Sequence, residues 1–144
     1  MSDNEREIRE IIEARHAAQR AGDVSTMLSY YASEVVMFTL APPLRQLTDP
    51  HDPGPVEKWL ATFEAPPTRE VSRLEITADG DVAFATSIDS MSAVPKGAAE
   101  GFTMWFRATI GLRRIDGRWL ITHEHDSVPF QMDGSLRAAV DLRP

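Results

Sequence analysis

Residues able to transfer protons or to bind anions are concentrated in two segments near the C-terminal end of the chain, 102–114 and 119–127. They are Arg107, His123, Glu124, His125 and Asp126, and Trp105 and Thr109 lie among them. An imidazole, or a carboxyl group whose pKa is raised by burial, can accept and return a proton near neutral pH, and a guanidinium can hold an anionic group. These residue types indicate a site that binds a small polar molecule and could act on it chemically.

Both segments alternate apolar and polar residues, which predicts two β-strands, and Asp116-Gly117 is typical of a two-residue hairpin turn between them. This turn places Arg107 opposite Asp126. One predicted face carries Met104, Phe106, Ala108, Ile110, Leu112, Trp119, Ile121, His123, His125 and Ser127. The other carries Trp105, Arg107, Thr109, Leu120, Thr122, Glu124 and Asp126, and is interpreted either as the floor of a pocket or as a solvated sheet surface. A three-residue turn with a glycine bulge would instead place Arg107 beside His125.

The two registers lead to different hypotheses for the chemistry. With the two-residue turn, Glu124 and Asp126 are the acid–base pair, unless a surface ion pair with Arg107 is their only role. With the shifted register, a neutral His125 accepts the proton while Arg107 holds an anionic substrate. The spacing of His123 and His125 also occurs in metal sites, but two histidines at a wet sheet edge are the simpler interpretation, and no metal is predicted.

Arg15 provides evidence for a polar cavity from a distant part of the chain. A capping box at 2–5 and a stop signal at Gly22 predict a helix over residues 3–21. The apolar stripe of this helix consists of Ile8, Ile11 and Ile12. Arg15 lies within that stripe, so its guanidinium either extends to solvent or points into a cavity, where a carboxylate of Glu124, of Asp126 or of a ligand would neutralise it.

The rest of the chain places helices before strands. A short helix is expected from Asp23, a strand from Val35 and a third helix from Pro55, after a loop containing five prolines. Further strands are expected over 71–76, 82–92, 102–114 and 119–127. This order predicts an α+β fold in which the helices cover one face of a curved antiparallel sheet.

Length and composition exclude several classes of protein. The 144 residues are expected to form one domain over 1–144, and the net charge of −7 argues against nucleic-acid or anionic-membrane partners. The absence of cysteine excludes thiol catalysis, thiolate zinc sites and iron–sulfur clusters, and we predict no cofactor. With neither a signal-peptide pattern nor an apolar stretch of membrane-spanning length, a cytoplasmic location is expected.

Three sequence motifs point to a known family. They are the run Gly117-Arg118-Trp119-x-Ile121-x-His123-x-His125-x-Ser127-x-Pro129, the pair Arg107-x-Thr109, and the segment Phe38-x-x-Ala41-Pro42-Pro43-Leu44. Together they resemble the SnoaL-like, ketosteroid-isomerase-like branch of the nuclear transport factor 2-like superfamily. The resemblance implies a cone-shaped, cystatin-like fold: three N-terminal helices pack in a strongly curved mixed or antiparallel sheet, with a pocket on its concave face. It also implies a homodimer formed through the convex face, which by this analogy would be the apolar face of the hairpin.

The resemblance does not extend to steroid isomerisation. An ungapped alignment places Thr39, Arg15 and Thr109 where steroid isomerases have a carboxylate base, a tyrosine and a second acid. We therefore predict a small-molecule-binding protein, which could be an isomerase, cyclase or hydratase-type enzyme acting on a small anionic or carbonyl-bearing compound. The alternative is a non-catalytic ligand-binding or dimerisation module. The predicted catalytic residues are Arg107, Glu124, His125 and Asp126, and the predicted ligand-binding residues are Arg15, Tyr31, Phe38, Trp59, Trp105, Thr109 and His123.

Overall fold

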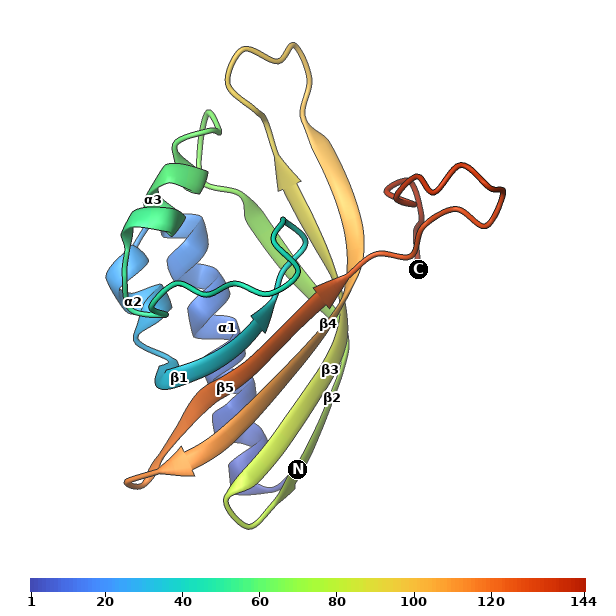
Figure 1. Ribbon diagram of the computed structural model, residues 1–144. Helices are drawn as coiled ribbons and strands as arrows, with labels where there is room; N and C mark the ends of the chain where they lie inside the picture. Colours follow the sequence, from blue (N-terminus) through green and yellow to red (C-terminus); the bar gives the residue numbers. More distant parts are fainter.

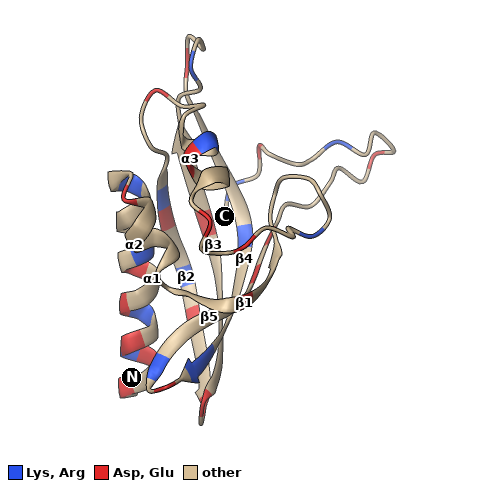
Figure 2. Ribbon diagram, turned by 60° about the vertical axis from the view of Figure 1, so that its left-hand side comes forward, with Lys and Arg blue, Asp and Glu red and all other residues tan.

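The first helix begins and ends where its capping residues predict. In the computed structural model, which describes residues 1–144, helix α1 spans Asp3–Ala21. The Ser2 hydroxyl accepts a hydrogen bond from the Glu5 amide at 3.1 Å, and Gly22 ends the helix with a left-handed φ of 72°. Ile8 and Ile12 are buried on its inner face. Basic and acidic residues are interspersed along the rest of the helix (Figure 2).

Two short helices accompany α1. Helix α2 spans Val24–Leu28, and the Asp23 side chain caps it by accepting from the Thr26 amide. Helix α3 spans Gly54–Leu60 with a proline in its first turn, as predicted. None of the helices is long and apolar enough to span a membrane.

Five strands form one mixed sheet that curves around α1 (Figure 1). They are β1 (Tyr31–Phe38), β2 (Thr68–Asp79), β3 (Val82–Ala93), β4 (Phe102–Ile115) and β5 (Arg118–Ser127), in the spatial order β1-β5-β4-β3-β2. Neighbouring strands are antiparallel except β1, which pairs with β5 in parallel. β1 begins four residues before the predicted Val35, because Tyr31 already pairs with Ile121. The α+β class with a mixed sheet is confirmed.

The hydrophobic core lies between the inner face of α1 and the concave face of the sheet. Its members from the last hairpin are Ile110, Leu112, Trp119 and Ile121, each no more than 4% exposed. The apolar face of the hairpin thus packs against α1 in the same chain. The prediction that this face is the convex, subunit-pairing surface is wrong. The apolar stripe of α1 packs against this face, so that each covers the other.

The register of the hairpin differs from both predicted alternatives. The turn has two residues, Asp116 and Gly117, both with positive φ as a primed turn requires. Leu112 pairs with Ile121, but Gly111 pairs with His123, so that one residue, Thr122, is extra in β5. This β-bulge exchanges the two faces of β5 beyond Ile121.

The bulge changes which residues share a face. Beyond it, Glu124 and Asp126 join the concave, apolar side of the sheet, and His123 and His125 move to the convex side. Arg107 pairs with Ser127 and with neither Asp126 nor His125, so both predicted partners are wrong.

The C-terminal segment extends away from the sheet after β5 (Figure 1). The helical spacing of Leu136, Ala139 and Val140 does not produce a helix. Leu136 has a φ of 58°, which an α-helix does not allow, and Phe130 forms an isolated bridge with Ala138 instead.

Candidate functional site

A buried ion pair joins α1 to the end of the sheet that contains the bulge. Arg15 Nη2 donates to Glu124 Oε1 at 2.5 Å, and the Tyr31 hydroxyl donates to Glu124 Oε2 at 2.6 Å. Arg15 Nη1 also donates to the Tyr31 oxygen at 3.1 Å. All three residues are at most 6% exposed, so that Arg15 lies in the interior and its neutralising carboxylate belongs to Glu124.

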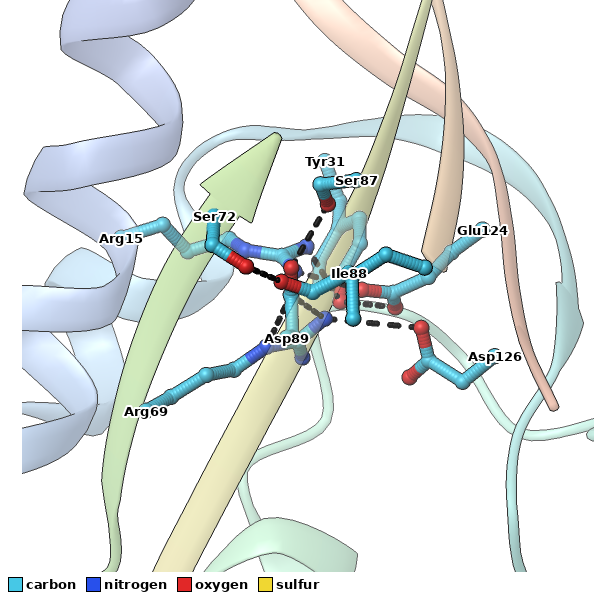
Figure 3. Close-up of polar contacts among 9 residues, drawn as sticks. All are labelled: Arg15, Tyr31, Arg69, Ser72, Ser87, Ile88, Asp89, Glu124 and Asp126. Carbon is cyan, nitrogen blue, oxygen red and sulfur yellow. Dashed lines mark hydrogen bonds and ion pairs between the residues drawn. The ribbon is translucent and has the colours of Figure 1, made fainter. Parts of the chain in front are cut away.

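A second ion pair lies beside the first and comes from β2 and β3. Arg69 Nε and Nη2 contact Asp89 Oδ2 at 2.8 and 2.7 Å, and the Ser87 hydroxyl donates to Asp89 Oδ1 at 2.6 Å. The Arg69 guanidinium also stacks over the Phe106 ring at 4.9 Å. Figure 3 shows that both arginines reach the cluster from the same side, whereas Glu124 and Asp126 reach it from the other.

Asp126 is the third carboxyl group of this cluster and the one with the weakest contact. Its Oδ1 lies 3.5 Å from Arg69 Nη2, and its Oδ2 makes no hydrogen bond. The side chain remains 12% exposed, whereas Asp89 is 1% exposed. Asp126 is therefore the most exposed carboxyl group of the cluster.

Charge pairing keeps the first ion pair ionised. Burial alone would lower the pKa of Arg15, but the adjacent Glu124 carboxylate outweighs it and the pKa is raised. Burial alone would raise the pKa of Glu124, but the charges of Arg15 and Arg69 lower it. Burial raises the pKa of Tyr31, which stays protonated and donates to Glu124. None of these three groups is suited to release or accept a proton near neutral pH.

Asp126 has the opposite balance of effects. Burial raises its pKa to about 6, and the repulsion of Glu124 and Asp89 acts in the same direction, while Arg69 and Arg15 oppose it. Two guanidiniums face three carboxyl groups, so the cluster is neutral only when one carboxyl group holds a proton. Asp126 is the group that takes this proton, and its pKa is close to the operating range of a general acid or base.

Several of the predicted site residues lie on the convex face, away from this cluster. Arg107 is exposed, and its Nε donates to the Ser127 hydroxyl at 3.1 Å. Thr109 pairs with His125 on the same face, and His123 Nδ1 lies 3.0 Å from the Val36 carbonyl oxygen. The prediction that Arg107 and Thr109 share a pocket with Glu124 and Asp126 is wrong because of the bulge.

The predicted aromatic ligand-binding residues are dispersed. Phe38 packs edge-on against His123 and His125 on the convex face, with ring centroids 5.5 and 5.2 Å apart. Trp59 lies on α3, is 36% exposed and contacts Phe63 edge-on. Trp105 pairs with Ser90 in β3, on the face opposite Asp89. Of the predicted ligand-binding residues, Arg15 and Tyr31 are those that the structure brings together with Glu124 and Asp126.

Four residues of the cluster region were not predicted. They are His16, Arg69, Ser87 and Asp89. A sequence signal exists for the first two. His16 follows Ile12 by four residues and thus lies on the same helical face. Arg69 precedes the partly buried Val71 by two residues, so that alternation along a strand places both side chains on the same face. Asp89 carries no such signal, because an acid in an alternating strand is normally exposed.

Two open hollows lie elsewhere on the surface. They have volumes of about 510 and 560 Å³ and meet at residues 64–66, between α3 and the start of β2. Neither is lined by Glu124 or Asp126. No three His, Asp or Glu side chains are arranged to hold a metal ion.

Comparison with known proteins identifies the family. A model of the SnoaL-like domain matches residues 8–131, which is most of the chain. The chain belongs to the SnoaL-like family. Among solved structures, this SnoaL-like protein is similar to a nuclear transport factor 2-like protein of unknown function from Pseudomonas putida KT2440. The two are 30% identical with a TM-score of 0.84, over 98% of this chain and 96% of the other.

More distant structures share the fold of this SnoaL-like protein. A provisionally named scytalone dehydratase from Novosphingobium aromaticivorans is 13% identical with a TM-score of 0.77, over 94% of this chain and 91% of that one. A nuclear transport factor 2-like protein from the same organism, described with a cystatin-like fold, is 15% identical with a TM-score of 0.67, over 97% and 89% of the two chains. The predicted family and cystatin-like fold are confirmed. No curated protein matches the sequence.

Proposed function

We propose that this SnoaL-like protein is an acid–base enzyme that moves a proton on a small carbonyl-bearing compound, with Asp126 as the group that accepts and returns the proton. The observation that carries the proposal is the state of this carboxyl group. It is 12% exposed, has one oxygen without a hydrogen bond, and has a pKa raised by burial to about 6. Such a carboxyl group can be ionised before reaction and protonated after it at neutral pH.

The reaction that suits a single buried carboxylate is removal of a proton from the carbon next to a carbonyl group. The carboxylate of Asp126 takes this proton, and the electron pair of the broken C–H bond forms the carbon–carbon double bond of an enolate. In an isomerisation the proton returns to the γ-carbon, and the double bond moves into conjugation. In a dehydration the proton goes to a β-hydroxyl group, which leaves as water when the enolate collapses.

The charges of the cluster favour a neutral carbonyl compound over an anion. Arg15 is already paired with Glu124, and Arg69 with Asp89, so neither guanidinium is free for a ligand carboxylate. Arg107, the expected anion-binding residue, lies on the other face of the sheet. Adding an anion near an ionised Asp126 would place further negative charge in a site that already has one carboxyl group in excess. The resemblance of the fold to a protein named as a dehydratase is compatible with this reaction class.

The experiment uses two related substrates that give the same product. β-Hydroxycyclohexanone loses water to form cyclohexenone, and the β,γ-unsaturated cyclohexenone isomerises to it, so that ultraviolet absorbance of the conjugated enone follows both reactions. We expect the wild-type protein to accelerate at least one of them, and Asp126→Asn to reduce the rate by about 10²–10⁴-fold.

The control is Asp79→Asn, which changes an exposed aspartate at the turn end of β2. It should leave the rate unchanged. A rate that is unaffected by Asp126→Asn would contradict the proposal. Absence of turnover with either ketone, together with absence of enzyme-dependent deuterium exchange at their α-carbons, would support the non-catalytic alternative instead.

A further inference from the structure

The inner face of α1 carries buried polar atoms that have no partner in the protein. His16 is 5% exposed and neither ring nitrogen has a hydrogen bond, and the Nε2 of Gln19, which is 4% exposed, has none either. The two residues lie three positions apart and so occupy neighbouring places on one helical face. Buried polar groups in folded proteins nearly always have a partner, and an exception calls for a bound water or ligand.

The surroundings of His16 determine what kind of partner fits. Burial, together with the positive charges of Arg69, Arg15 and Arg20, lowers the pKa of His16 to about 2. The imidazole is therefore neutral at physiological pH and offers one N–H donor. The Gln19 amide adds its N–H groups to this donor. Hydrogen-bond donors favour an acceptor oxygen that carries partial negative charge, such as that of a carbonyl group.

The site is connected to Asp126 through Arg69. His16 directly follows Arg15, whose guanidinium binds Glu124 in the same cluster, and α1 packs against β2, which carries Arg69. The Arg69 guanidinium contacts Asp126 at 3.5 Å. A small molecule bound against α1 would thus lie beside the same guanidinium that contacts the candidate base. Arg69 itself is held by Asp89, so it stays fixed between the two groups.

We infer that His16 and Gln19 form the carbonyl-oxygen subsite of the proposed enzyme. Their N–H groups donate to the carbonyl oxygen of the ligand and hold it with its α-carbon toward Asp126. When the α-proton leaves, the negative charge that develops on this oxygen is stabilised by the same donors. The inference rests on the proposed function for this last step, but binding of the carbonyl group does not depend on turnover.

The test follows the histidine ring signals by nuclear magnetic resonance while cyclohexanone is added to the wild-type protein. The chain has four histidines, and the other three are built-in controls: His51 is in a loop, and His123 and His125 are on the convex face. Cyclohexanone should shift the His16 ring signals and leave the other three in place. Because this measurement uses the unaltered protein, it does not depend on any variant folding.

Variants then assign the binding to the two side chains. Gln19→Leu should weaken cyclohexanone binding about tenfold, as expected for the loss of one hydrogen bond in a buried site. Glu13→Leu, an exposed position on the same helix, should not change it. Cyclohexanecarboxylate, a matched anionic probe, should bind more weakly than the ketone.

Three results would overturn the inference. They are an unchanged His16 signal with cyclohexanone, equal affinities in Gln19→Leu and wild type, and a His16 response to the carboxylate alone. Asp126→Asn separates this inference from the proposed function, because that variant should still bind cyclohexanone at His16 while turnover is lost. Ketone binding at His16 without any turnover would leave the subsite intact and reject the enzymatic proposal.

Discussion

Replacing Asp126 by asparagine should stabilise the protein at neutral pH while it removes the candidate base. Burial raises the pKa of Asp126 from the ordinary 3.8 to about 6. Between these two values the folded protein holds a proton that the unfolded chain has released, so the free energy of unfolding of the wild type falls as the pH rises. One pKa unit corresponds to about 1.4 kcal/mol, and a shift of about two units therefore costs about 3 kcal/mol once the carboxyl group is ionised in both states.

Asparagine has the shape of a protonated aspartate and never ionises. The variant and the wild type should thus have similar free energies of unfolding at about pH 4, and the variant should be more stable by about 2–3 kcal/mol above about pH 7. Urea denaturation at a series of pH values measures this difference. Fluorescence is a suitable signal, because Trp119 is 2% exposed in the folded protein.

The control is again Asp79→Asn, which removes an exposed carboxyl group and should not give the stabilisation expected of Asp126→Asn. A constant difference for Asp126→Asn across the same range would refute the reasoning. So would a variant that becomes the less stable protein above about pH 7, because that result would mean that attraction to Arg69 outweighs burial.

Further predictions concern the rest of the cluster. With the β,γ-unsaturated ketone, kcat/KM should rise with pH through about 6 and then level off, because the reactive form of Asp126 is the carboxylate; a pH-independent profile would contradict this. Glu124→Gln should lower the free energy of unfolding by about 3–5 kcal/mol because Arg15 is left charged and buried, whereas the double replacement Arg15→Met with Glu124→Leu should recover most of it in urea denaturation. His16→Gln should reduce the loss of stability between about pH 6.5 and 4, since the wild-type unfolded chain takes up a proton there that the folded protein does not. Arg107→Ala should leave the rate with both ketones unchanged, and a large loss of rate would show that the convex face takes part.

The features that could be predicted from the sequence are those set by local chemistry. The capping box at Ser2 and the glycine at position 22 define α1, and Asp116-Gly117 defines the last turn. Arg15 could be placed on the apolar stripe of α1 because helical periodicity needs no knowledge of the partner. Because a buried arginine needs a negatively charged partner, the candidates for the carboxylate that pairs with Arg15 were few, and Glu124 was one of them.

The rest depended on contacts between distant segments. The bulge at Thr122 inserts one residue within β5, which has no glycine or proline of its own, and the glycine beside it, Gly111, is in β4. Counting outward from the turn therefore fails beyond Ile121. Arg69 and Asp89 form a pair across β2 and β3, and each alone resembles a solvated strand residue. Their burial follows from the curvature of the sheet over α1, which the sequence pattern does not specify.

The extra residue in β5 also affects how positions are matched between relatives. In this chain, the inward-facing acid Glu124 follows the inward-facing Ile121 by three positions, whereas a strand without the bulge would have the equivalent acid two positions later. Counting from Gly117 would therefore assign the role of Glu124 to His123, which lies on the convex face. The equivalent residue in a relative is identified by its cross-strand partner, which here is Ile110.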